Sequence, residues 1–248
     1  MTNRAAFHRG NHPGKPVVAR GKNSLTFDNG DGTKTSVVTI APLHKGSGSF
    51  TQSDEIDTAW QSVTGAWDYE FTSSDFQVEA RDTFNVGNIF RFTDPASGEW
   101  VEFDPQSLNW VDENYSRQQI AIKQAVTAQI NDYIINFPDA WGSGRHFRYE
   151  AHTTRLGKYI TIDNASDLPA VTLQGTTIFL EVEFSLASSS GVDIYLDGQL
   201  WQKTNGVRVA TANQIEFKDS ATGSNILWWL DYPTVKDSTI DEDGYPRS

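Results

Sequence analysis

Short runs in which apolar and polar residues alternate dominate this chain, and such runs predict β-strands. In residues 89–103, Phe90 and Phe92 share one face of an extended segment, and Val101 and Phe103 share a face of the next. The residues between them read Asp-Pro-Ala-Ser-Gly, which is typical of a turn. The sequence therefore predicts a β-hairpin over residues 89–103.

The same pattern recurs along the chain. Residues 193–201 carry an Asp-Gly dipeptide between two alternating runs, as a type I′ hairpin requires. The turn in residues 214–228 resembles that of residues 89–103. This similarity indicates either a weak internal repeat or two unrelated turns that use the same residue types. Many short strands predict an all-β fold, an antiparallel β-sandwich or jelly-roll-like body. The remaining predicted strands lie in residues 24–40, 147–151, 159–162 and 178–184.

Residues 116–137 fit two structures. Ser116 and Gln119 match the capping box of a helix, and the Gln, Ala and Lys content supports one. Ile120, Ile122 and the apolar residues after them alternate as a strand would. We favour strands, because both flanks are predicted strands and residues 131–132, Asn-Asp, supply a turn.

The N-terminal residues differ in composition from the rest. Residues 1–22 contain Gly, Pro, His and positive charge with little apolar periodicity, which predicts an extended arm that orders against a partner or, alternatively, a floppy terminus. We therefore divide the chain into an N-terminal arm with a hairpin and a Gly/Ser-rich linker (1–57), a β-sandwich body of one domain or two subdomains (58–233) and an acidic C-terminal tail (234–248).

Charge is distributed unevenly. The formal net charge of -12 repels phosphate, which argues against nucleic acid as a partner. Five basic residues nevertheless precede the first acidic one, and we expect them to pair with acidic groups of a protein partner. These candidate partner-binding residues are Arg4, Arg9, Lys15, Arg20 and Lys22.

Other sequence features restrict compartment and chemistry. The chain has no cysteine, so disulfides and thiolate sites are excluded. It shows neither a signal-peptide pattern nor eighteen consecutive apolar residues, so we expect synthesis in the cytoplasm and no membrane partner. Phosphate-loop, zinc-helix and nucleophile-elbow motifs are missing as well. We expect no catalytic residue, metal or cofactor.

Two polar groups were weighed as sites. His146, Arg148, Glu150 and His152 would lie on the same side of a strand, but the two histidines would stand ~20 Å apart at ~3.3 Å per residue, too far for one metal. Glu181 and Glu183 also share a strand face, whereas the two carboxylates of a glycosidase oppose each other across a cleft. Solvated sheet faces explain both groups better.

The tryptophans suggest either a core or a contact surface. Trp60, Trp67, Trp110 and Trp141 fit a core, or alternatively a platform on which sugars stack. Trp228 and Trp229 would point to opposite sides of a strand, so one of them is left for an edge or a contact. We take Trp229 as a further candidate partner-binding residue.

Two motifs in the second half of the chain form a distinctive pattern. An aromatic-Gly-x-Gly segment, Trp141 to Gly144, is followed by an L-x-K-x-I-x-I run from Leu156 to Ile162. With these motifs, residues 82–233 resemble a β-rich module of tailed-phage virion proteins. The stretch from Val192 to Gly198 with Trp201, and Ile215-Glu216-Phe217, are similar to the second half of that module.

The resemblance implies a virion structural protein, such as a capsid decoration, head-fibre or tail-associated component, with no catalytic residues. The expected partners are other virion proteins and further copies of the chain in a homo-oligomer. Family members continue well past this module, so the shorter chain better suits a compact decoration or adaptor protein. A glycan-binding β-sandwich module for host attachment is the alternative hypothesis.

Overall fold

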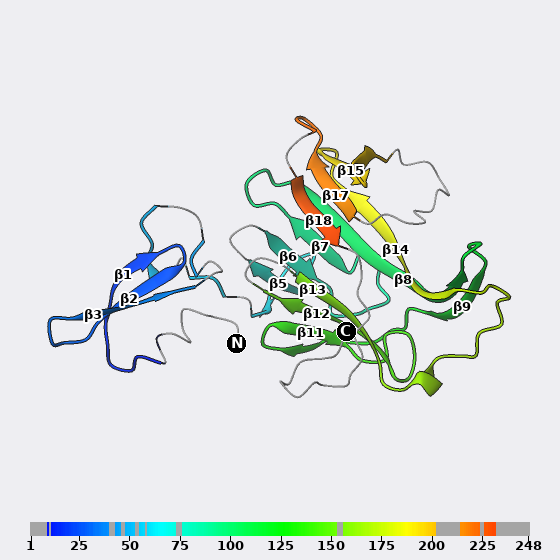
Figure 1. The fold of residues 1–248 in the computed structure, drawn as a ribbon, viewed down its shortest axis with the longest axis horizontal. Helices are drawn as coiled ribbons and strands as arrows, with labels where there is room; N and C mark the ends of the chain where they lie inside the picture. Colours follow the sequence, from blue (N-terminus) through cyan, green and yellow to red (C-terminus); the bar gives the residue numbers. More distant parts are fainter. Residues whose placement is uncertain are drawn as a thin grey trace. The chain divides into compact units, whose positions relative to one another are not determined.

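The computed structural model describes residues 9, 11–39, 43–45, 48–52, 55–57, 59–72, 76–152, 156–201, 214–223 and 226–231. For residues 214 and 226–231 only the backbone is described. The elements are antiparallel β-strands and a short 3-10 helix, Ala165–Asp167, which confirms the predicted all-β fold (Figure 1). The chain forms two compact units, residues 1–187 and 188–248, and their boundary falls within the stretch predicted as the body.

Residues 9–57 contain a three-stranded antiparallel sheet, which we call the N-terminal module. Its strands are β1 (Val17–Gly21), β2 (Ser24–Asp28) and β3 (Lys34–Val38), in that order. The predicted hairpin of residues 24–40 is therefore confirmed, with Phe27 opposite Thr35.

The N-terminal module folds more of the chain than the sequence suggested. Val17 to Gly21, expected to be part of an extended arm, pair with β2. Leu43 was expected in a Gly/Ser-rich linker. It is instead buried against Leu25 and Phe27 and belongs to the core of the module. Residues 1–8 lie outside the described residues.

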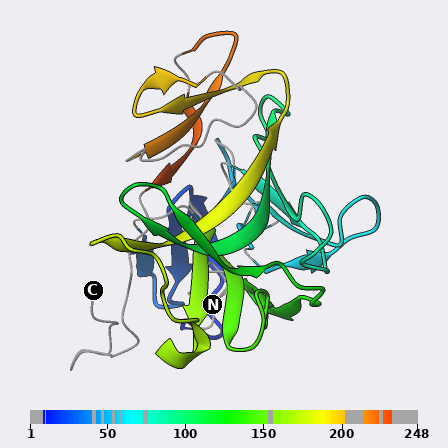
Figure 2. The same ribbon diagram turned by 90° about the vertical axis from the view of Figure 1, so that its right-hand side faces the viewer.

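A seven-stranded sheet forms the first layer of the body. Six strands follow the order β14-β8-β7-β6-β5-β4, and β9 pairs with the second half of β8. The long strands β8 and β14 lie side by side in both views (Figures 1 and 2). The strands are β4 (Gln61–Ser62), β5 (Tyr69–Thr72), β6 (Gln77–Ala80), β7 (Phe90–Thr93), β8 (Trp100–Asp112), β9 (Arg117–Ile122) and β14 (Ile178–Ser188).

A four-stranded sheet forms the second layer, in the order β10-β11-β12-β13. Its strands are β10 (Gln129–Asn131), β11 (Ile134–Phe137), β12 (Arg145–Ala151) and β13 (Leu156–Ile162). Residues 116–137 thus form strands, as favoured over a helix, and Asp132 makes the predicted turn with a φ of 57°.

The two layers share one aromatic core, which makes the body sandwich-like. Phe84 and Phe90 pack against Phe137, Phe147 and Tyr149 of the four-stranded sheet, with ring centroids 4.0–6.1 Å apart. Aromatic rings bury a large apolar area each, so this cluster joins the two layers.

The second compact unit has a four-stranded sheet, ordered β16-β15-β17-β18. The turn at Asp197 and Gly198 has φ values of 46° and 79°, as predicted for a type I′ hairpin. Asp94 and Asp219 each accept backbone N–H bonds within their own turns, so the two turns have the same chemistry. The strands are β15 (Val192–Leu196), β16 (Gln199–Leu200), β17 (Gln214–Asp219) and β18 (Ile226–Asp231).

Candidate functional site

The basic residues predicted to bind a partner make contacts inside the N-terminal module. The Arg9 guanidinium donates to the Glu55 carboxylate, and Arg20 Nε lies 3.8 Å from the same carboxylate. Lys15 Nζ donates to Asn29 Oδ1 at 2.9 Å. The side chain of Glu55 is only 3% exposed, so Arg9 and Arg20 act first as its internal counterions.

The other candidate partner-binding residues are placed less completely. The Lys22 carbonyl accepts the backbone N–H of Leu43, which fastens the end of the module. Arg4 lies outside the described residues. Trp229 lies in β18, and its backbone pairs with Glu216 of β17. A partner-binding role for all of these residues stays a prediction.

Three of the four tryptophans considered for a sugar platform are buried, so these four do not form one. Trp60, Trp67 and Trp141 are at most 5% exposed, and Trp141 belongs to the aromatic cluster of the body. Trp110 is half-buried and donates its indole N–H to the Pro169 carbonyl at 3.0 Å. A flat indole face is therefore not presented to solvent by the three buried residues.

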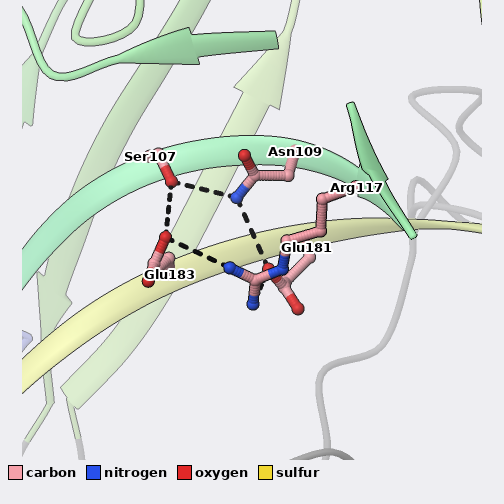
Figure 3. A network of polar contacts seen from close by, with 5 residues as sticks. All are labelled: Ser107, Asn109, Arg117, Glu181 and Glu183. Atoms are coloured by element: carbon pink, nitrogen blue, oxygen red, sulfur yellow. Dashed lines mark hydrogen bonds and ion pairs between the residues drawn. The ribbon is translucent and has the colours of Figure 1, made fainter. Parts of the chain in front are cut away.

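A closed polar network joins β8, β9 and β14 (Figure 3). Arg117 lies 2.6 Å from Glu181 and 3.4 Å from Glu183. Ser107 donates to Glu183 at 2.9 Å, and Asn109 donates to Ser107 at 2.9 Å and to Glu181 at 3.4 Å. We call these five residues the β8–β14 network. Each of its side chains has a protein partner, so the two glutamates serve as structural counterions here.

Residues 168–177 form a strap along the β8–β9 hairpin. Gln118 donates to the Ala170 carbonyl at 2.8 Å and accepts from the Thr172 N–H at 2.7 Å. At the far end, Glu113 accepts the N–H groups of Thr176 and Thr177, both at 3.0 Å. These hydrogen bonds, the one from the Thr176 N–H foremost, lower the pKa of Glu113 to about 2.

The outer side of the β10–β13 sheet carries a row of polar side chains. Ile135, Phe137 and Phe147 face the core, so the alternate residues of β11 and β12 face outward. The backbone register aligns Gln129, Asn136 and Arg148 in one row across three strands. Directly opposite residues have Cβ atoms ~4.5–5.5 Å apart, so these side chains lie close together.

This row lies in a depression of about 350 Å³, which we call the amide face. The depression is shallow and open to solvent, because Gln129, Asn131 and Thr161 are exposed, so it would hold a small ligand on a surface and not enclose it. The lining contains three amides, one hydroxyl, one imidazole, one guanidinium and two apolar side chains. These residues are Gln129, Asn131, Ile134, Asn136, Pro138, His146, Arg148 and Thr161.

His146 is held in one orientation at the rim of the amide face. Its Nδ1 accepts the Asp139 N–H at 2.9 Å, which leaves the ring proton on Nε2. Nε2 lies 3.1 Å from Asp163 Oδ2 and donates to it. Asp139 Oδ1 in turn accepts the Gly144 N–H at 2.8 Å. Gly144 has a φ of 73°, and a Cβ there would lie 2.5 Å from the Asp167 carboxylate, so the turn requires glycine.

Arg148 is fixed on two sides. Its Nη2 lies 3.2 Å from Glu150 Oε1, and its guanidinium carbon lies 4.9 Å from the Tyr159 ring centroid. The Arg148 Nε is buried and has no hydrogen-bond partner among the described residues. The sequence predicted that His146, Arg148 and Glu150 face the same, outer side of the strand, and the structure agrees. The Arg148 Nε is thus a buried donor of the lining without a partner in the described chain.

Lys158 lies on the inner side of the edge strand β13. Its Nζ is 4.2 Å from the Phe184 ring centroid and 6.0 Å from that of Phe103. Desolvation lowers the pKa of Lys158 from 10.5 to about 8. The residue as a whole remains exposed, so solvent weakens the energetic effect of this shift. A lysine at an inward position of an edge strand opposes edge-to-edge pairing.

Sequence reasoning found part of the amide face and missed its amides. Gln129, Asn131 and Asn136 escaped notice because amides on exposed strands are common and carry no motif. The available signal was their spacing, because residues 129 and 131 share one strand side and Asn136 follows after the turn at residues 131–132. Within the described chain, no three His, Cys, Asp or Glu residues gather as metal ligands.

Comparisons with known proteins do not assign the chain to a family. No family model matches it, and no significant match is found among characterised proteins or solved structures. None of the described helical segments is long and apolar enough to cross a membrane. The proposals below therefore rest on the sequence and the geometry.

Proposed function

We propose that this protein is a non-enzymatic structural component of a phage-type virion, such as a capsid decoration or a head- or tail-associated protein. It acts through protein–protein assembly. Support comes from the sequence resemblance of residues 82–233 to virion modules and, independently, from the N-terminal module.

The N-terminal module carries the proposal, because its core is too small for a self-sufficient domain. Leu25, Phe27 and Leu43 form its buried apolar cluster, with Val17 and Val37 packed against them, and Ile56 is the other fully buried apolar side chain among the described residues of the module. Folded units below ~40–60 residues bury little apolar surface and are commonly stabilised by association. Docking onto another protein would provide the missing burial.

The outward surface of the module fits such docking. Val38 is 75% exposed and Val18 is 47% exposed, on the two edge strands of the sheet. Edge strands with free backbone groups and β-branched side chains pair readily with a strand of another chain. Because Arg9 and Arg20 already neutralise Glu55, apolar contact and strand pairing contribute more to this surface than their charge does.

The polar groups weighed for catalysis are engaged in structural contacts. Glu181 and Glu183 both bind Arg117, and His146 is held by Asp139 and Asp163. A carboxylate that is neutralised by a neighbouring guanidinium is poorly suited to act as a general acid. This arrangement supports a role in assembly over a hydrolytic one.

Mass spectrometry of gradient-purified virions tests the proposal directly. The chain should be present in a fixed ratio to the major capsid protein across the particle peak. A non-structural protein of the same phage serves as the negative control and should be lost. Absence of the chain from particles that are otherwise complete would contradict the proposal.

A second measurement tests the N-terminal module. Val38→Lys places a charge on the exposed edge, and Val86→Lys places the same charge at another exposed valine, which is 39% exposed. Incorporation into particles should fall for Val38→Lys and stay unchanged for Val86→Lys. Equal incorporation of both variants would show that this edge is not the docking surface.

A further inference from the structure

We propose that the amide face binds a neutral carbohydrate of one or two sugar units. This inference goes beyond the assembly role, because a structural component of a particle does not need a ligand site. It assigns a site and a ligand class to a surface that the assembly argument does not use.

Solvent-facing hydrogen-bonding groups without a protein partner carry the argument, because a ligand can replace their water. Among the residues that the structure describes, the side chains of Gln129, Asn131, Asn136 and Thr161 make no hydrogen bond to protein. Each amide offers two donors and an acceptor, and the hydroxyl offers one donor and two acceptors. Sugar hydroxyls also donate and accept, so adjacent hydroxyls of one ring match neighbouring amides on a sheet.

The charge around the amide face selects against anions. Arg148 is the one formal cation in the lining, and Glu150 lies 3.2 Å from it. Asp139 and Asp163 add negative charge next to His146 at the rim. A phosphate or carboxylate ligand would meet a surface that is neutral to negative, whereas a neutral polyol loses nothing by electrostatic repulsion.

Two apolar side chains complete the match to a sugar. Ile134 and Pro138 lie in the same lining as the amides, and both are half-buried. A pyranose ring has hydroxyl edges and faces of C–H groups, so it needs apolar contact beside hydrogen bonds. Ligand sites in general combine apolar lining with a few polar groups that fix orientation.

The amide face is also pre-organised. Gln129 and Asn136 lie on the paired strands β10 and β11, and the neighbouring Ile130 and Ile135, which are also paired, pack those strands against the core. Side chains on packed strands are positioned more accurately than side chains on loops. Arg148 is held by Glu150 and Tyr159, so the floor of the depression changes little on binding.

Saturation-transfer NMR with the full chain tests the inference. The probes are glucose, galactose, mannose, N-acetylglucosamine, lactose and maltose, with inorganic phosphate as the anion arm. At least one neutral sugar should bind saturably in the millimolar range. The double variant Gln129→Ala/Asn136→Ala should weaken that binding by about 10–100-fold, because it removes two hydrogen-bonding groups.

Gln119→Ala is the matched control, because Gln119 is an exposed strand glutamine on β9, outside the depression. It should bind the sugar like the unaltered chain. Dispersed amide spectra of all three proteins exclude misfolding as the cause of a loss.

Three outcomes would overturn the inference: no saturable transfer to any of the sugars, unchanged binding by the double variant, or preferential binding of phosphate. The presence of the chain in purified virions is measured independently, so either proposal can fail without the other.

Discussion

The β8–β14 network and the amide face are both groups of polar side chains on β-strands, but they differ in their hydrogen-bond partners. In the network, Asn109 is 4% exposed and bonds to Ser107 and Glu181. On the amide face, Asn136 makes no side-chain bond to the described protein. Buried polar groups need partners within the fold, whereas solvent-facing groups keep water as a partner.

This difference separates structure from function more clearly than residue type does. The network contains glutamates, an arginine and a serine, which would attract attention as catalytic candidates. Arg117 is shared by both glutamates, and the hydrogen bonds from Ser107 and Asn109 link β14 to β8. The amide face holds three amides and a hydroxyl of little chemical reactivity beside His146 and Arg148, and these amides and this hydroxyl have no partner in the described protein, so they can bind a ligand.

The largest difference in unfolding free energy should separate the variants of Arg117 and Arg148. Arg117→Ala leaves Glu181 and Glu183 without their cation and should cost about 1–3 kcal/mol of unfolding free energy. Arg148→Ala removes a pair whose arginine side chain is 40% exposed and should cost at most about 1 kcal/mol. Urea denaturation of both variants measures the difference, and equal losses would contradict the contrast.

A matched pair of asparagines tests the same comparison without charge. Asn109→Ala removes a buried amide and two hydrogen bonds, so the unfolding free energy should fall by about 1–2 kcal/mol. Asn136→Ala should change it by less than about 0.5 kcal/mol, as expected of a surface substitution. Thermal unfolding followed by circular dichroism would show this, and a larger loss for Asn136→Ala would mean that the amide face is structural.

Lys158 differs from both groups, because its ammonium group lies against aromatic rings. Its pKa of about 8 in the fold lies below 10.5, so between these values the unfolded chain binds more protons. Stability should therefore rise with pH across this window. Lys158→Met should flatten that rise, and the effect should be small because the residue is exposed. An unchanged pH profile of urea midpoints in the variant would contradict the shift.

The smallest effect concerns the strap. There the exposed carboxylate of Glu113 accepts hydrogen bonds from two backbone N–H groups. Its pKa of about 2 lies below the ordinary 4.5, so its contribution is complete above pH 4.5 and is lost as pH falls toward 2. The Thr176 and Thr177 amide resonances should titrate in this low range, and Glu113→Gln should abolish the titration. A midpoint near 4.5 would show that the hydrogen bonds do not persist in solution.

The sequence alone determined much of the fold, because strands and turns obey local rules. Alternation placed β7 and the first residues of β8, which continues to Asp112, and the Asp-Gly dipeptide placed the turn between β15 and β16. The outward side of His146 and Arg148 followed from the same period of two. Such features depend on neighbours within a few residues, which the sequence displays directly.

Only the tertiary structure decided which polar groups are satisfied. Glu181 and Glu183 meet Arg117 across more than sixty residues, and Arg9 meets Glu55 across forty-six. Leu43 became core because β1 to β3 left a gap that an apolar side chain from outside the sheet fills. Pairing at this range depends on strand order, which local alternation does not specify. Local pattern therefore fixes where side chains point, while strand order fixes whether a polar group finds a protein partner or stays free for a ligand.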